Sequence, residues 1–196
     1  MPQTAERRYH HGNLRAALLA RAEAVLRKQG AGALSLRELA RDVGVSHGAP
    51  RRHFAGKQAL LDALARQGFE RLAAALAGAD PGGPFGPRVA AVSRAYVAFA
   101  TREAALLDLM FAVKHQAPDE ELRAAADGAF APMLTLIADG EAAGELAPGD
   151  AEAFGLALFA TLQGLAALAN GGMLPAGTHD DCVGDAVARL LRGSRP

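Results

Sequence analysis

Apolar residues recur every three or four positions along nearly the whole chain, the spacing that places them on one face of a helix. Turns rich in glycine and proline interrupt this pattern, and no segment alternates apolar and polar residues as a half-buried strand does. The sequence therefore predicts an all-α fold. The expected helices lie at about 13–29, 35–43, 46–54, 57–78, 88–102, 104–115, 119–143, 150–170 and 179–192.

The second expected helix has the best-defined start. Ser35 and Glu38 stand in the spacing of a capping box, in which each side chain accepts a hydrogen bond from the backbone amide of the other residue. Leu34 and Leu39 occupy the two positions of a hydrophobic staple around that start. Gly44 follows the helix and can adopt the left-handed conformation that a tight turn requires.

Residues 36–54 have the layout of a helix-turn-helix, whose second helix enters the major groove of DNA. Ala40 is small where the two helices meet, and Val45 is expected to fill the core below the turn. Ser46 is expected to cap the third helix. Lys57 begins the next helix, where its ammonium group and the free backbone amides suit a phosphate. The third helix would expose side chains suited to base edges and phosphates, namely His47, Arg51 and Arg52, beside Gly48.

Basic and acidic residues are also distributed unevenly, and the division lies shortly after this helix-turn-helix. Residues 1–66 carry 12 Lys and Arg against 5 Asp and Glu, whereas residues 67–196 carry 9 against 16. A basic end on an acidic body indicates that one end alone meets a polyanion. We therefore expect a DNA-binding domain at 1–66 and a helical ligand-binding and dimerisation domain at 67–196.

Other classes of protein find little support in the sequence. No uninterrupted apolar run reaches the roughly 18 residues of a membrane span, and Cys182 is the one cysteine, so we expect a cytoplasmic protein without a membrane partner. No group of histidines and cysteines has the spacing of a zinc site, and the adjacent His10 and His11 fit an N-terminal arm better than a metal pair. No nucleophile and base are paired in the sequence. We expect no metal, no cofactor and no enzymatic activity.

The run from Ser35 to Leu61 resembles the signature of the TetR (tetracycline-repressor-like) family, chiefly in His53-Phe54 followed by Lys57 and Leu60. The resemblance is strong over about residues 10–70 and weak afterwards. It implies a homodimeric transcriptional regulator, expected to be a repressor on a near-palindromic double-stranded operator, whose C-terminal domain binds a small molecule that releases the DNA. The residues expected at DNA are Ser35, Arg37, Ser46, His47, Gly48, Ala49, Arg51, Arg52, His53 and Lys57.

Two positions depart from the family pattern, which usually has leucine at 50 and tyrosine at 51. Pro50 removes an early backbone hydrogen bond of the third helix, although a first turn tolerates proline better than a helix interior does. Arg51 replaces a phenol with a longer cation, which should raise salt-dependent affinity for DNA. These departures bear on the operator sequence rather than on DNA binding itself.

The C-terminal helices carry large residues that can surround a hydrophobic effector, with Gln163 and His115 as polar handles. Ordinary core packing is the alternative for each of them. The expected pocket residues are Phe99, Leu106, Met110, Phe111, His115, Phe130, Met133, Ile137, Phe159 and Gln163.

The last two helices carry apolar stripes at helical spacing. Two antiparallel helices with wide apolar faces can pair with a symmetry mate in a four-helix bundle, so we expect a homodimer through about 150–192. The stripes consist of Phe154, Leu158, Leu162, Leu165 and Leu168, then Val183, Val187, Leu190 and Leu191.

Two rival functions remain open at this point. One is an architectural protein that binds DNA without sequence preference, which salt-dependent binding to any duplex would favour. The other is a helical enzyme or carrier that has kept a basic N-terminal module, which turnover of a bound hydrophobic compound would favour.

Overall fold

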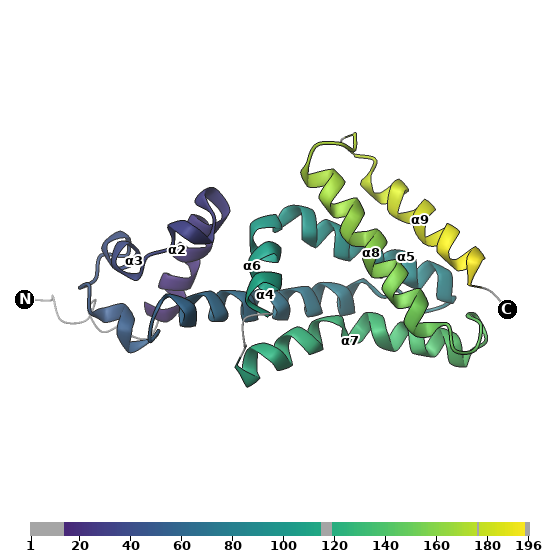
Figure 1. Cartoon of the computed structure of the whole chain (residues 1–196), viewed down its shortest axis with the longest axis horizontal. Helices are drawn as coiled ribbons and strands as arrows, with labels where there is room; N and C mark the ends of the chain where they lie inside the picture. Colours follow the sequence, from purple (N-terminus) through teal and green to yellow (C-terminus); the bar gives the residue numbers. More distant parts are fainter. Residues whose placement is uncertain (1–13, 115–118, 176, 195–196) are drawn as a thin grey trace, which may run out of the picture. The chain divides into compact units, whose positions relative to one another are not determined.

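The computed structural model describes residues 14–114, 119–175 and 177–194, and the regular structure of those residues is entirely helical (Figure 1). The expected all-α class is confirmed. In chain order the elements are α2 (Leu14–Gln29), the 3₁₀ turn η1 (Ala31–Ala33), α3 (Leu36–Asp42), the 3₁₀ turn η2 (Ala49–Arg52), α4 (Lys57–Ala79), α5 (Phe85–Arg102), α6 (Ala104–Lys114), α7 (Glu120–Ala142), α8 (Ala151–Asn170) and α9 (His179–Gly193).

The chain folds into two compact units. One comprises Met1–Gly68 and Ala105–Arg123, and the other comprises Phe69–Ala104 and Ala124–Pro196. Helix α4 contributes residues to both units, and most of α6 belongs to the first. The domain boundary expected at residue 66 stays a prediction.

Helix α2 forms because its apolar residues share one face, and this face supplies much of the core of the first unit. The helix ends at Gly30, which adopts φ 77° and donates its amide to the Leu26 carbonyl at 2.9 Å, a conformation that glycine reaches without strain. Residue 13, where the first helix was expected to begin, lies outside the described residues. The buried residues of α2 are Leu14, Leu18, Leu19, Ala22 and Leu26.

The start of α3 corrects one expectation. Ser35 occupies the cap position, and Leu34 and Leu39 are both buried as a staple requires, but neither hydrogen bond of the capping box forms. The exposed Glu38 carboxylate instead lies 3.9 Å from the Arg41 guanidinium, which accounts for its missing contact with the Ser35 amide but not for that of the Ser35 hydroxyl. The helix is therefore held by its apolar contacts rather than by its side-chain cap.

The third element is also not the α-helix that the spacing predicts over 46–54. Residues Ala49–Arg52 form a single 3₁₀ turn, preceded by a turn at residues 47–48. Pro50 explains the difference, since it has no amide hydrogen to donate and disfavours the α conformation of Ala49 before it. Ser46 contributes its backbone carbonyl to Ala49 at 2.9 Å, and the cap position of the turn is held by Gly48.

In the second unit, α5 packs against α8 and α9, which also pack against each other. The loop before α5 is fixed by an ion pair in which the Arg88 guanidinium donates twice to the Asp80 carboxylate, from Nε at 2.9 Å and from Nη2 at 2.7 Å. Gly82 donates its amide to the same carboxylate. These hydrogen bonds, first that from Arg88 and then that from Gly82, lower the pKa of Asp80 to about 2.

Some of the apolar residues that were expected at a dimer interface are buried in the core of the chain itself. Phe154, Leu158 and Leu162 of α8 and Val183 and Val187 of α9 are buried inside the chain. The reason is that α8 is apolar on nearly all sides, so that its spacing alone does not identify the inward face. A different row of α8 faces outward, made of Ala153, Leu156, Ala157, Ala160, Gly164, Ala167 and Leu168.

Candidate nucleic-acid interface

The first unit holds a tight helix-turn-helix. Ala40 is fully buried on α3, and Gly44 makes the turn with φ 74°. The amide of Val45 closes the turn on the Ala40 carbonyl at 2.9 Å, while the Val45 side chain is only half-buried rather than part of the core. The turn thus positions the segment that follows it through its backbone.

The segment from Pro50 to Phe54 is anchored at both ends. Pro50 is buried, and its carbonyl accepts hydrogen bonds from the amides of His53 and Phe54, both at 2.9 Å. Phe54 is only 2% exposed, and the Arg15 guanidinium of α2 lies 5.5 Å from the centre of its ring. Because the anchors point inward, the residues between them face solvent.

Most of the residues expected at DNA are therefore accessible. Ser35 and Ala49 are half-buried. The exposed members are Arg37, Ser46, His47, Gly48, Arg51, Arg52, His53 and Lys57. This surface is rich in cations and contains no acidic residue between positions 43 and 61, a composition that attracts a polyanion.

Lys57 has a second role that the sequence analysis missed. Its ammonium group donates a hydrogen bond to the Gly32 carbonyl at 2.9 Å, which ties the start of α4 to η1. An ammonium group has three donors, so the contact with Gly32 leaves others available for a phosphate. No local spacing reveals this contact, because the two residues are 25 positions apart.

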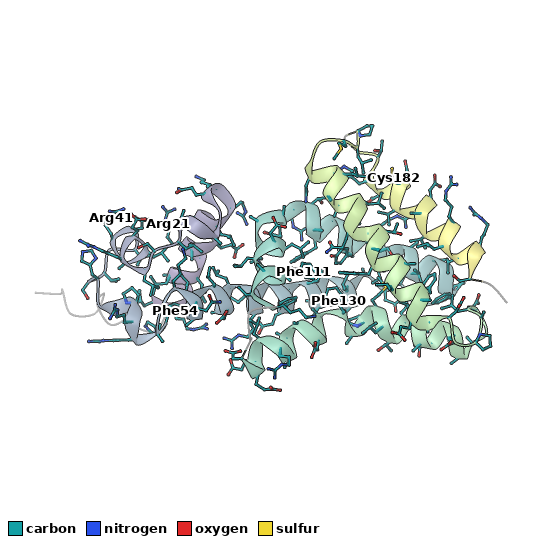
Figure 2. The ribbon with its side chains drawn as sticks, viewed as in Figure 1. Arg21, Arg41, Phe54, Phe111, Phe130 and Cys182 are labelled. Atoms are coloured by element: carbon teal, nitrogen blue, oxygen red, sulfur yellow. The ribbon has the colours of Figure 1, made fainter. Side chains whose placement is uncertain are left out.

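The neighbouring arginines of α2 and α3 are engaged in ion pairs. Arg21 of α2 meets Asp42 of α3 at 2.8 Å, and Arg41 lies within 4 Å of both Glu38 and Asp42. Figure 2 labels Arg21 and Arg41 on these two helices. The pair between Arg21 and Asp42 joins the two helices, whereas Arg51 and Arg52 have no ion pair within the described part of the chain.

The expected effector residues fall into both units, and His115 lies outside the described residues. In the first unit, Leu106 and Met110 are buried against Gly68 of α4, and Phe111 is half-buried. The second unit contains Phe99, Phe130, Met133, Ile137, Phe159 and Gln163.

An aromatic cluster joins several residues of the second unit. The rings of Tyr96, Phe130 and Phe159 lie 5.6–6.4 Å apart between centroids, and Figure 2 labels Phe130 among these helices. The Tyr96 hydroxyl donates to the Gln163 side-chain oxygen at 2.8 Å. Burial raises the pKa of Tyr96 above its ordinary value, so this phenol stays neutral. The sequence analysis missed Tyr96, although its polar tip within the apolar stripe of α5 was an available signal.

Comparisons with known proteins agree with this geometry. Residues 18–64 match the family described as bacterial regulatory proteins, tetR family. Residues 89–193 match the family described as tetracyclin repressor-like, C-terminal domain. A comparison with curated protein sequences found no match.

Solved structures extend the similarity to nearly the full chain. A protein of unknown function from Rhodococcus sp. RHA1 is 44% identical, with a TM-score of 0.88 over 96% of this chain and 98% of that one. A tetR-family bacterial regulatory protein from Rhodococcus RHA1 is 25% identical, with a TM-score of 0.72 over 92% and 96%. The regulator PfmR from Thermus thermophilus, 19% identical with a TM-score of 0.68 over 89% and 97%, shares the fold. The chain belongs to the tetR family of bacterial regulatory proteins.

Proposed function

We propose that this regulator is a sequence-specific repressor, which binds its operator as a homodimer and leaves it when a small hydrophobic ligand binds. The observation that carries the DNA-binding part is the exposed cationic surface of residues 46–57 on an anchored backbone. Such a surface binds a polyanion by neutralising its charge, and contacts with base edges add sequence preference.

The DNA-binding part is tested with a pool of duplexes that contain 20 random base pairs. The full chain should enrich a family of related sites. The double variant Arg51→Ala/Arg52→Ala should bind the enriched duplex at least tenfold more weakly in fluorescence anisotropy, with a smaller dependence on salt. Arg102→Ala is the matched control, since Arg102 is an exposed arginine at the end of α5 in the other unit and lies outside the expected dimer region. Equal affinities for the wild type and the double variant would refute the assigned interface.

The outer row of α8 supports the homodimer. Only 22% of an apolar 18-residue stretch of α8 is buried, and Leu156 is 69% exposed. By length and composition alone this helix also qualifies as a membrane span, a weak indication shared by many helices of other kinds. Gly164 belongs to this row, and a Cβ atom placed there would meet nothing within 4 Å, so a second helix can approach closely. A second copy of the chain is the occupant that we propose for this face.

Sedimentation at micromolar concentration tests the homodimer. The wild type should sediment as a dimer, and Leu156→Glu should sediment as a monomer because the new carboxylate would be desolvated in the interface. Leu134→Glu on α7 is the control, since Leu134 is 60% exposed and lies outside the row. A monomeric wild type, or a dimeric Leu156→Glu variant, would refute the assignment.

The aromatic cluster supports the effector part of the proposal. Three rings beside one neutral hydrogen-bonded pair suit an apolar ligand that carries a single polar group. N-phenyl-1-naphthylamine, a neutral fluorescent compound, should bind the wild type and weaken its complex with the enriched duplex. Phe159→Ala should weaken the binding of this compound, whereas Leu134→Ala should not. Binding of the compound without any change in DNA affinity would refute its coupling to release.

A further inference from the structure

The 3₁₀ turn η2 holds two consecutive arginines on a fixed backbone. Pro50 on one side and Phe54 on the other are buried, and the Pro50 carbonyl is shared by the amides of His53 and Phe54. The backbone of Arg51 and Arg52 is thus fixed before any ligand arrives, which lowers the entropy lost when these residues bind.

The two guanidinium groups are exposed and unpaired within the described residues. Other arginines of the same unit are paired, since Arg21 forms an ion pair with Asp42 and Arg66 forms one with Glu121. No acidic residue lies between positions 43 and 61 to compete for Arg51 or Arg52. Both side chains therefore keep their full set of donors for a partner outside the chain.

A guanidinium group has the shape to recognise guanine. Its two parallel N–H groups match the O6 and N7 acceptors that guanine presents in the major groove, whereas a lysine ammonium acts as a point charge. The same fork also matches two oxygens of a phosphate, so shape alone does not select the base. The pair lies, however, in the segment that follows the turn of the helix-turn-helix, the part of this motif that enters the major groove. Resting on the DNA-binding function proposed above, we infer that the Arg51–Arg52 pair reads guanine, so that each half-site of the operator contains a guanine contacted by one of the two.

The experiment starts from duplexes enriched by the full-length wild-type chain out of a pool with 20 random base pairs. Each guanine of an enriched duplex is replaced in turn by 7-deazaguanine, which removes the N7 acceptor and leaves the phosphates unchanged. Affinities are measured for the wild type, Arg51→Lys and Arg52→Lys, with Arg102→Lys as the control of equal charge. The lysine variants keep the attraction to phosphate and lose the bidentate contact.

The inference predicts that at least one 7-deazaguanine weakens wild-type binding by about five- to one-hundred-fold. The same substitution should change the affinity of the lysine variant that has lost this contact by less than twofold, and it should keep its full effect on the affinity of Arg102→Lys. If no substitution weakens wild-type binding, or if both lysine variants keep the wild-type response at every guanine, the inference is overturned while sequence-specific binding stands. If the pool yields no enriched site, the proposed function and this inference fail together.

Discussion

Replacing Gly68 by alanine tests how α4 and α6 pack in the first unit. Gly68 is buried on α4, and a Cβ atom placed there would lie 2.5 Å from the sulfur of Met110 and 3.2 Å from Cγ of Leu106. Real Cβ atoms do not approach neighbours at 2.5 Å, so the side chain of Met110 would have to move. Met110 is fully buried, which leaves it little space for that movement.

Two opposing effects set the expected change in the free energy of unfolding of Gly68→Ala. Alanine is favoured over glycine in a helix interior by about 0.5–1 kcal/mol. Overpacking a filled core costs about 1–3 kcal/mol, and the flexibility of methionine places the expected cost near the middle of that range. Gly68→Ala should therefore lower the free energy of unfolding by about 1 kcal/mol. Gly78→Ala on the same helix is the control, because a Cβ atom at Gly78 meets nothing within 4 Å.

Urea unfolding followed by circular dichroism at 222 nm measures both variants. Gly68→Ala should shift the midpoint to lower urea, whereas Gly78→Ala should leave it unchanged or raise it. Adding Met110→Ala to Gly68→Ala should remove the clash, so the double variant should be more stable than the sum of the two single losses predicts. If Gly68→Ala matches or exceeds the stability of Gly78→Ala, the close contact between α4 and α6 is not present in solution.

Three further substitutions probe other contacts. Burial raises the pKa of Tyr96 in the folded protein, so the stabilisation from its neutral form is complete below pH 10. Above that pH the free energy of unfolding should fall by up to about 1.4 kcal/mol per pH unit. Tyr96→Phe should flatten this slope in unfolding measured between pH 9 and 12. The hydrogen bond from Arg88 lowers the pKa of Asp80 from 3.8 to about 2, so the stabilisation is present above pH 3.8 and is lost as the pH falls through 2. Acid titrations of the wild type and of Asp80→Asn should differ in that window, and identical curves would contradict the ion pair. Phe54→Ala should cost about 3–5 kcal/mol in urea unfolding and abolish DNA binding, whereas an unchanged midpoint would contradict the anchored segment.

Helical spacing was sufficient to predict most of the fold, since burial of one face produces that spacing directly. The left-handed turn at Gly44 was predicted for a similar reason, because its local conformation needs no distant partner. It was harder to predict which of two nearby partners a side chain would contact. Glu38 has two possible partners within a few positions, and only the structure shows that it approaches Arg41 rather than the amide of Ser35.

The candidate sites show where sequence reasoning reaches its limit. Pro50 was expected to disturb the start of an α-helix, but its effect is larger, because its missing amide hydrogen and its restriction of Ala49 leave only a 3₁₀ turn. The Tyr96–Gln163 hydrogen bond joins residues 67 positions apart and has no local signal. The outward face of α8 could not be predicted either, because a helix that is apolar on all sides has no polar stripe to mark its exposed side.

We expect the cationic surface of residues 46–57 to bind operator DNA in a symmetric complex. Hydroxyl-radical footprinting of the complex with an enriched duplex measures both the contact and its symmetry. Two protected half-sites should appear, related by a dyad and separated by about one helical turn or a multiple of it, and both protections should be lost together in Arg51→Ala/Arg52→Ala. A single unpaired footprint, uniform protection without boundaries, or unchanged protection in the double variant would contradict this expectation.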